Sequence, residues 1–80
     1  MTIILSDRQY SFAVFSWQDN YFLTVLPKGT LDHDITMRLT EHEVRTFEGD
    51  RNKAIATASD LVGRTAAYRD RLVDPPITPR

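Results

Sequence analysis

Residues 12–26, Phe-Ala-Val-Phe-Ser-Trp-Gln-Asp-Asn-Tyr-Phe-Leu-Thr-Val-Leu, are the stretch that decides the fold. They contain two strand-like runs, Phe12–Trp17 and Tyr21–Leu26, because aromatic and β-branched residues dominate both. The link between the runs ends in Asp19-Asn20, two residue types that tolerate left-handed backbone geometry. The stretch therefore predicts a β-hairpin that turns at Asp19-Asn20.

Both faces of this hairpin are apolar. A strand with one solvated face alternates apolar and polar residues, and neither run does so cleanly. A chain of 80 residues can cover one face of a sheet with its own helices and has little left to cover the other. The excess predicts an interface with a second copy of the chain or with another protein, and its candidate residues are Phe15, Trp17, Tyr21 and Phe22.

Further strands flank the hairpin. Thr2–Leu5 is β-branched and apolar, which predicts a short first strand, and Pro27-Lys28-Gly29-Thr30 predicts a turn after the hairpin. The segment 34–39 has the clearest alternation in the chain. Its apolar residues Ile35, Met37 and Leu39 alternate with Thr36 and Arg38, which predicts a strand with one buried and one solvated face.

Helix signals follow the strands. Thr40-Glu41-His42-Glu43 fits a capping box and predicts a helix over 41–48. Asp50 can start a second helix over 51–62, although the apolar spacing also permits one helix over 41–62 that is kinked at Gly49. A short third helix is expected over 66–72, before the two prolines 75 and 76.

Strands followed by helices predict an α+β fold. We expect two layers, with a three- or four-stranded antiparallel meander and two or three helices packed on one face of it. The face with Ile35, Met37 and Leu39 should meet the helices through five apolar residues, Val44, Phe47, Ile55, Ala58 and Leu61. Residues 1–74 form the single domain in this interpretation, and residues 75–80 form a flexible tail.

Composition limits the function classes. The chain has no cysteine, which excludes disulfides and thiolate metal sites. No apolar run approaches the ~20 residues of a membrane helix, and Asp7 and Arg8 interrupt the N-terminal apolar run too early for a signal peptide. We therefore expect a cytoplasmic protein without a membrane partner, and the small size favours a bacterial source.

Candidate chemistry is sparse. Asp32-His33-Asp34 and Glu41-His42-Glu43 carry metal-binding residue types, but a strand separates the two histidines by roughly 20 Å or more. No serine lies in a nucleophile motif, and the three glycines are isolated rather than grouped as a phosphate loop. The sequence thus predicts no catalytic residue, no metal site and no cofactor, and we expect a protein that is not an enzyme.

Three functions stay open. The first is a non-enzymatic protein-interaction domain, acting as a homodimer or by covering a partner surface. The second is a small inhibitor of the immunity-protein type, for which the acidic segment 32–50 is the support. The third is single-stranded RNA binding on the aromatic face. Because residues 10–26 hold only Asp19 as a charged residue and the net charge is −1, nucleic acid is disfavoured.

Overall fold

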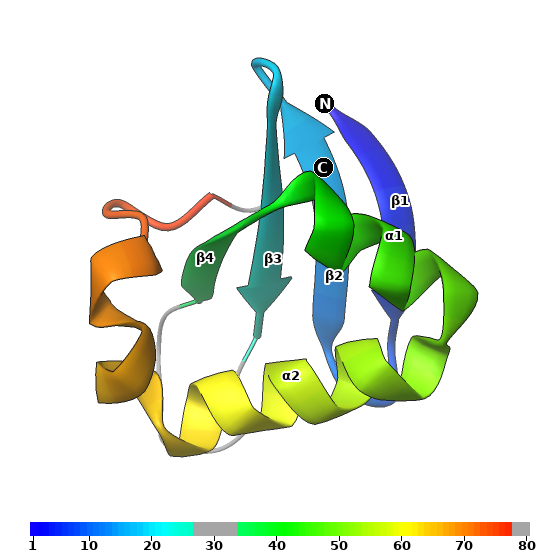
Figure 1. Ribbon diagram of the computed structural model, residues 1–80. Coiled ribbons are helices and arrows are strands. Elements are labelled where there is room, and N and C mark those ends of the chain that lie inside the picture. Colours follow the sequence, from blue (N-terminus) through cyan, green and yellow to red (C-terminus); the bar gives the residue numbers. More distant parts are fainter. Residues whose placement is uncertain (27–33, 78–80) are drawn as a thin grey trace.

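The computed structural model describes residues 1–26 and 34–77, and in them four strands are followed by helices (Figure 1). The sheet order is β1-β2-β3-β4, and each strand pairs antiparallel with the next. The strands are β1 Thr2–Asp7, β2 Phe12–Trp17, β3 Asn20–Val25 and β4 Ile35–Leu39. This α+β meander confirms the predicted fold class. The turn predicted at 27–30 lies outside the described residues.

The hairpin between β2 and β3 turns one residue earlier than predicted. Trp17 pairs with Asn20, so Gln18 and Asp19 form a two-residue loop and Asn20 already belongs to β3. Both loop residues have positive φ, 50° at Gln18 and 64° at Asp19. Positive φ at both positions is the type I′ geometry, whose twist matches that of the flanking strands.

The predicted capping box starts α1, which spans Glu41–Gly49. The Glu43 amide donates to Thr40 Oγ1 at 3.1 Å, and the Thr40 amide donates to Glu43 Oε1 at 2.9 Å. Two of the amides that a helix N-terminus leaves without backbone partners are thereby satisfied.

Residues 41–63 form two helices rather than one kinked helix. Asp50 lies between α1 and α2 (Arg51–Gly63) with extended backbone angles, φ −148° and ψ 99°. Its amide donates to the Thr46 carbonyl at 3.0 Å, and its carboxylate accepts the Asn52 amide at 3.0 Å. One residue therefore ends the first helix and begins the second, with no linker between them.

The core lies between the sheet and the two α-helices, which pack on one face of it (Figure 1). As predicted, the strand face with Met37 and Leu39 meets the buried helix residues Val44, Phe47 and Leu61. Ile35 and Ile55 pack at the margin of the same cluster. The opposite face, called the back face here, carries Ala13, Phe15, Trp17, Phe22, Thr24, Thr36 and Arg38.

The short third helix expected over 66–72 is a 3₁₀ helix, η1, which spans Thr65–Arg71. None of its residues is fully buried. Arg71 attaches it to the rest of the fold, because its guanidinium donates to the Glu43 carboxylate and to the Arg38 carbonyl, the latter at 2.9 Å. The Glu43 carboxylate thus serves both the capping box and the attachment of η1.

The outer strand β1 contains a bulge. Ile3 pairs with Phe15 and Leu5 with Val14, so Ile4 is an extra residue in the ladder. At the end of the strand, the Arg51 guanidinium donates to the Ser6 carbonyl at 2.7 Å. Both features make this edge of the sheet a poor template for a further strand.

The hairpin loop offers a test of the type I′ assignment. Replacing Gln18-Asp19 by Asn-Gly (Gln18→Asn with Asp19→Gly) should stabilise the protein by about 1 kcal/mol, because Asn and Gly adopt positive φ at less cost. The urea unfolding midpoint should rise while the slope of the transition stays unchanged. An unchanged or lower midpoint would contradict the assigned turn.

Candidate functional site

Three large apolar side chains are exposed at Met1, in β1 and at the end of β2. Met1 is 53% exposed and Ile3 is 50% exposed, while Trp17, the last residue of β2, is 38% exposed. Met1 and Trp17 line one hollow of about 370 Å³ at the tip of the β2–β3 hairpin. Ile3 lies next along β1, paired with Phe15. We call these three residues the apolar corner.

The structure separates the four predicted interface residues. Phe15 is fully buried and Phe22 is 6% exposed, and their rings stack with centroids 5.5 Å apart. Tyr21 is half-buried on the helix side of the sheet, against the core. Trp17 is the one member of the set that remains exposed on the back face, so it alone joins the apolar corner.

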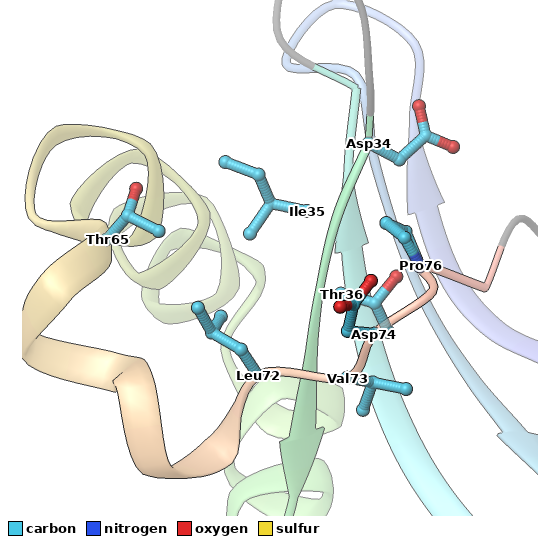
Figure 2. A pocket seen from close by; sticks show the side chains of 8 residues that line it. All are labelled: Asp34, Ile35, Thr36, Thr65, Leu72, Val73, Asp74 and Pro76. Carbon is cyan, nitrogen blue, oxygen red and sulfur yellow. The ribbon is translucent and has the colours of Figure 1, made fainter.

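A C-terminal segment covers part of the back face. Residues 72–77, which we call the strap, leave η1 and cross β4 from the helix side to the back face (Figure 2). Leu72 forms an isolated antiparallel bridge with Met37, and the Val73 amide donates to the Thr36 carbonyl at 2.9 Å. The strap therefore pairs with the outer edge of β4 before it reaches the back face.

Ile77 fixes the end of the strap to two threonines. The Thr24 hydroxyl lies 2.7 Å from the Ile77 carbonyl and 2.8 Å from the Thr36 hydroxyl, and the Ile77 amide donates to Thr36 Oγ1 at 2.9 Å. The Thr36 hydroxyl also lies 3.2 Å from the Ile77 carbonyl, and either hydroxyl can be the donor in the contact between Thr24 and Thr36. The three groups close a ring of hydrogen bonds.

At the strap, the structure differs from two expectations drawn from the sequence. Thr36 was expected on a solvated face, yet it is 1% exposed because the strap lies over it. A flexible tail was expected over 75–80, yet Ile77 is held by the threonine ring, while residues 78–80 lie outside the described part. The physical reason is shared: two buried hydroxyls need partners, and the strap supplies them.

Another hollow lies where the strap leaves η1. It measures about 410 Å³, and its walls include Ile35, Leu72, Thr65 and Pro76 (Figure 2). Asp34 and Asp74 add carboxylates to the same lining. The apolar walls and open form make it a surface groove between strand edge and strap.

The back face carries one basic side chain near Trp17. Arg38 pairs across from Phe22, and its guanidinium donates to the Asn20 side-chain oxygen at 2.7 Å. Trp17, Phe22 and Arg38 line a hollow of about 350 Å³ together with Ile77 of the strap. Arg38 is also the only basic residue in the four strands, so phosphate binding has little support there.

The strongest electrostatic cluster joins α2 to η1. Arg64 donates to both carboxylate oxygens of Asp60, at 2.8 and 2.9 Å, and the Tyr68 hydroxyl donates to the same carboxylate. The Arg64 hydrogen bonds, followed by that of Tyr68, lower the pKa of Asp60 to about 2. The hydrogen bond to Asp60 raises the pKa of Tyr68. The cluster clamps the two helices and holds no group poised for proton transfer near neutral pH.

Metal-binding residue types do not gather in the described part of the chain. Within residues 1–26 and 34–77, no group of three or more histidine, cysteine or acidic residues could hold a metal ion. His42 is exposed in the first turn of α1. Asp32 and His33 lie outside the described residues. The same part of the chain has no helix long and apolar enough to cross a membrane.

Sequence reasoning missed the strap because its residues have no periodicity. The segment Leu72-Val73-Asp74-Pro75-Pro76-Ile77 forms neither a helical stripe nor a strand alternation. One signal was available: Thr24 and Thr36 both fall on the back-face positions of neighbouring strands. Directly paired threonines in a buried position imply a further hydrogen-bonding partner.

The cluster of Asp60, Arg64 and Tyr68 makes the free energy of unfolding at acid pH depend on the charge of Asp60. Because its folded-state pKa of about 2 lies below the ordinary 3.8, its contribution is complete above pH 4 and is lost as the pH falls toward 2. Asp60→Asn should therefore lower the urea unfolding midpoint near neutral pH. The difference between the midpoints of wild type and variant should shrink as the pH falls from about 4 to about 2. Arg64→Gln should weaken that pH dependence. A difference that stays constant down to about pH 2 would contradict the assignment.

The chain was compared with known proteins in three ways. No family model matches it, and neither a curated protein nor a solved structure shows significant similarity.

Proposed function

We propose that this chain is a non-enzymatic protein-interaction domain that binds a protein surface, most simply that of a second copy, through its back face. The observation that carries the proposal is the apolar corner. Met1, Ile3 and Trp17 are each between 38% and 53% exposed at one end of the sheet. Large apolar side chains gathered in this way are typical of interaction sites.

The corner contacts a partner through the sheet face rather than through the strand edge. The bulge in β1 and the Arg51–Ser6 hydrogen bond oppose the addition of a strand there. Ile3 and Trp17 instead project from the face that the α-helices leave uncovered. An aromatic residue such as Trp17 is a frequent energetic centre of such contacts.

The size of the corner limits how tightly it can bind alone. Complete burial of a large apolar side chain contributes about 1.5–3 kcal/mol, and these three are already half-buried, so together they add roughly 2–5 kcal/mol. Association costs on the order of 4–15 kcal/mol in lost translational and rotational freedom. The corner therefore serves as the anchor of an interface that includes more of the back face.

A second candidate is a small inhibitor of the immunity-protein type. The observation that favours it is the pair of exposed acidic residues at the end of α1, Glu48 and Asp50, whereas Glu41 at its start is paired with Arg45. Such a surface complements a basic enzyme or toxin. It predicts binding that weakens with salt, whereas binding through the apolar corner should change little with salt.

RNA binding on the aromatic face is less well supported. Phe15 and Phe22 are buried and stack on one another, which leaves Trp17 as the accessible ring of that face. Arg38 supplies a single cation near it. Single-stranded RNA sites combine several stacking rings with a basic groove.

The corner can be tested by charge substitution. Wild-type protein at roughly tens of micromolar should show twice the chain mass by size exclusion with light scattering, whereas Ile3→Lys and Trp17→Lys should be monomeric. Both positions are half-exposed, so the variants should keep the wild-type circular dichroism.

Tyr10→Lys is the matched control. Tyr10 is 48% exposed, but it lies beside Ile55 and Val62 of α2, away from the corner. This variant should assemble like wild type. A monomeric wild type, or equal loss of assembly in the control, would contradict the proposal.

A further inference from the structure

A hollow with apolar walls lies on the back face next to Ala13. It measures about 310 Å³, and Ile3, Ala13 and Leu26 contribute its apolar lining. Leu26 is 46% exposed there. Ala13 lies on the same face of β2 as Trp17, four residues earlier, and its short side chain leaves the space above it open. We call this space the Ala13 hollow. One strand thus presents a large exposed ring near its end and a hollow near its start.

Opposite charges flank the ring and the hollow. Arg8 lines the Ala13 hollow, and Asp19 lies in the hairpin loop, two residues after Trp17. Both side chains are exposed, and in the described part of the chain neither forms an ion pair. Asp7, which also lines the hollow, lies 3.6 Å from the Arg51 guanidinium and is paired there. The hollow is therefore flanked by a positive charge, and the ring by a negative one.

One two-fold axis matches the ring to the hollow. Phe15 is midway between Ala13 and Trp17 along β2. Rotation by 180° about an axis that lies over the back face and crosses the strands at Phe15 turns a second copy face to face with the first. It places Trp17 of each copy over the Ala13 hollow of the other. Ile3, which pairs with Phe15, then lies near the axis and meets Ile3 of the second copy.

The same axis matches the charges. Arg8 follows Asp7, the residue that pairs with Phe12 at the start of β2, and Asp19 follows Trp17 at its end. The two charges thus lie just beyond opposite ends of one strand, at similar distances from its centre. The rotation that seats Trp17 therefore also brings Asp19 of each copy to Arg8 of the other.

We propose that two copies of the chain form a two-fold symmetric dimer in which Trp17 of each fills the Ala13 hollow of the other and Asp19 of each pairs with Arg8 of the other. The proposal rests on the proposed function and specifies how the copies are arranged. A second copy is the occupant because a two-fold interface requires a self-complementary surface, and one rotation matches both the shape and the charge of this face. The apolar contacts supply most of the affinity, and the ion pairs at the rim fix the orientation.

The strap leaves room for this contact. It lies over Thr24 and Thr36, which are level with Ala13 but belong to β3 and β4. The rotation places it against the other end of these two strands, where Asn20 and Arg38 line an open hollow of about 350 Å³. The contact is centred on β1 and β2, so Arg38 of β4 stays at its margin.

Reversal of the two charges tests the arrangement. Arg8→Glu and Asp19→Lys should each raise the dissociation constant of the dimer at least about fivefold at low ionic strength, because each reversal creates two like-charge contacts in a symmetric pair. Glu48→Lys is the matched control, since it reverses an exposed charge on α1, in the helix layer. It should leave the constant unchanged. Sedimentation velocity gives the constants, and circular dichroism confirms that each variant is folded.

Mixing the two variants restores both ion pairs in one heterodimer. The two substituted side chains, a glutamate and a lysine, face one another in one contact, and the unsubstituted Arg8 and Asp19 face one another in the second. The heterodimer should therefore associate at least about fivefold more tightly than either variant alone, and native mass spectrometry should identify it by its mass. Only an arrangement that brings position 8 of one copy to position 19 of the other gives this rescue.

Ala13→Leu checks the seat of Trp17 without a change of charge. The larger side chain fills the hollow, so the dissociation constant should rise at least about fivefold while the circular dichroism stays that of wild type. Unchanged association of this variant would overturn the proposed seat.

The outcomes separate this arrangement from the proposed function. A wild-type dimer that Trp17→Lys disrupts, but whose charge variants gain nothing on mixing, would keep the corner as the binding site and overturn the two-fold arrangement. A wild type that stays monomeric would contradict both. Loss of association in Glu48→Lys equal to that in Asp19→Lys would also overturn the arrangement, because it would show a general effect of charge.

Discussion

The structure depends on one constraint: its sheet carries buried apolar residues on both faces, while α1 and α2 cover only one of them. A chain of 80 residues buries a modest share of its surface, so a third layer of helices is beyond its length. The strap covers part of the second face. Its six residues end in a ring of hydrogen bonds that joins Ile77 to Thr24 and Thr36. The strap does not cover the apolar corner, which stays exposed.

The features that the sequence predicted well are those with a local physical cause. The alternation of Ile35, Met37 and Leu39 identified the face of β4 that meets the helices, because the side chains of a strand alternate between its faces. The capping box at Thr40 and Glu43 located the start of α1, because its hydrogen bonds join residues three apart. Neither inference needed knowledge of the rest of the fold.

The features that the sequence left open depend on distant contacts or on backbone angles. Gln18 takes a positive φ for which its residue type has no preference, so the hairpin turn was placed one residue late. Phe15 and Phe22 were expected at an interface because nothing in the pattern revealed that they stack within the chain. The strap joins residues 72–77 to strands more than thirty positions earlier, and no local pattern encodes such a contact.

The Glu43 carboxylate links parts of the chain that are far apart in the sequence. It accepts the Thr40 amide at the start of α1 and also the Arg71 guanidinium at the end of η1. Formation of α1 and positioning of η1 are therefore thermodynamically coupled, since each orders the group that the other uses. A change confined to the first turn of α1 would be felt at the end of η1, where the strap begins.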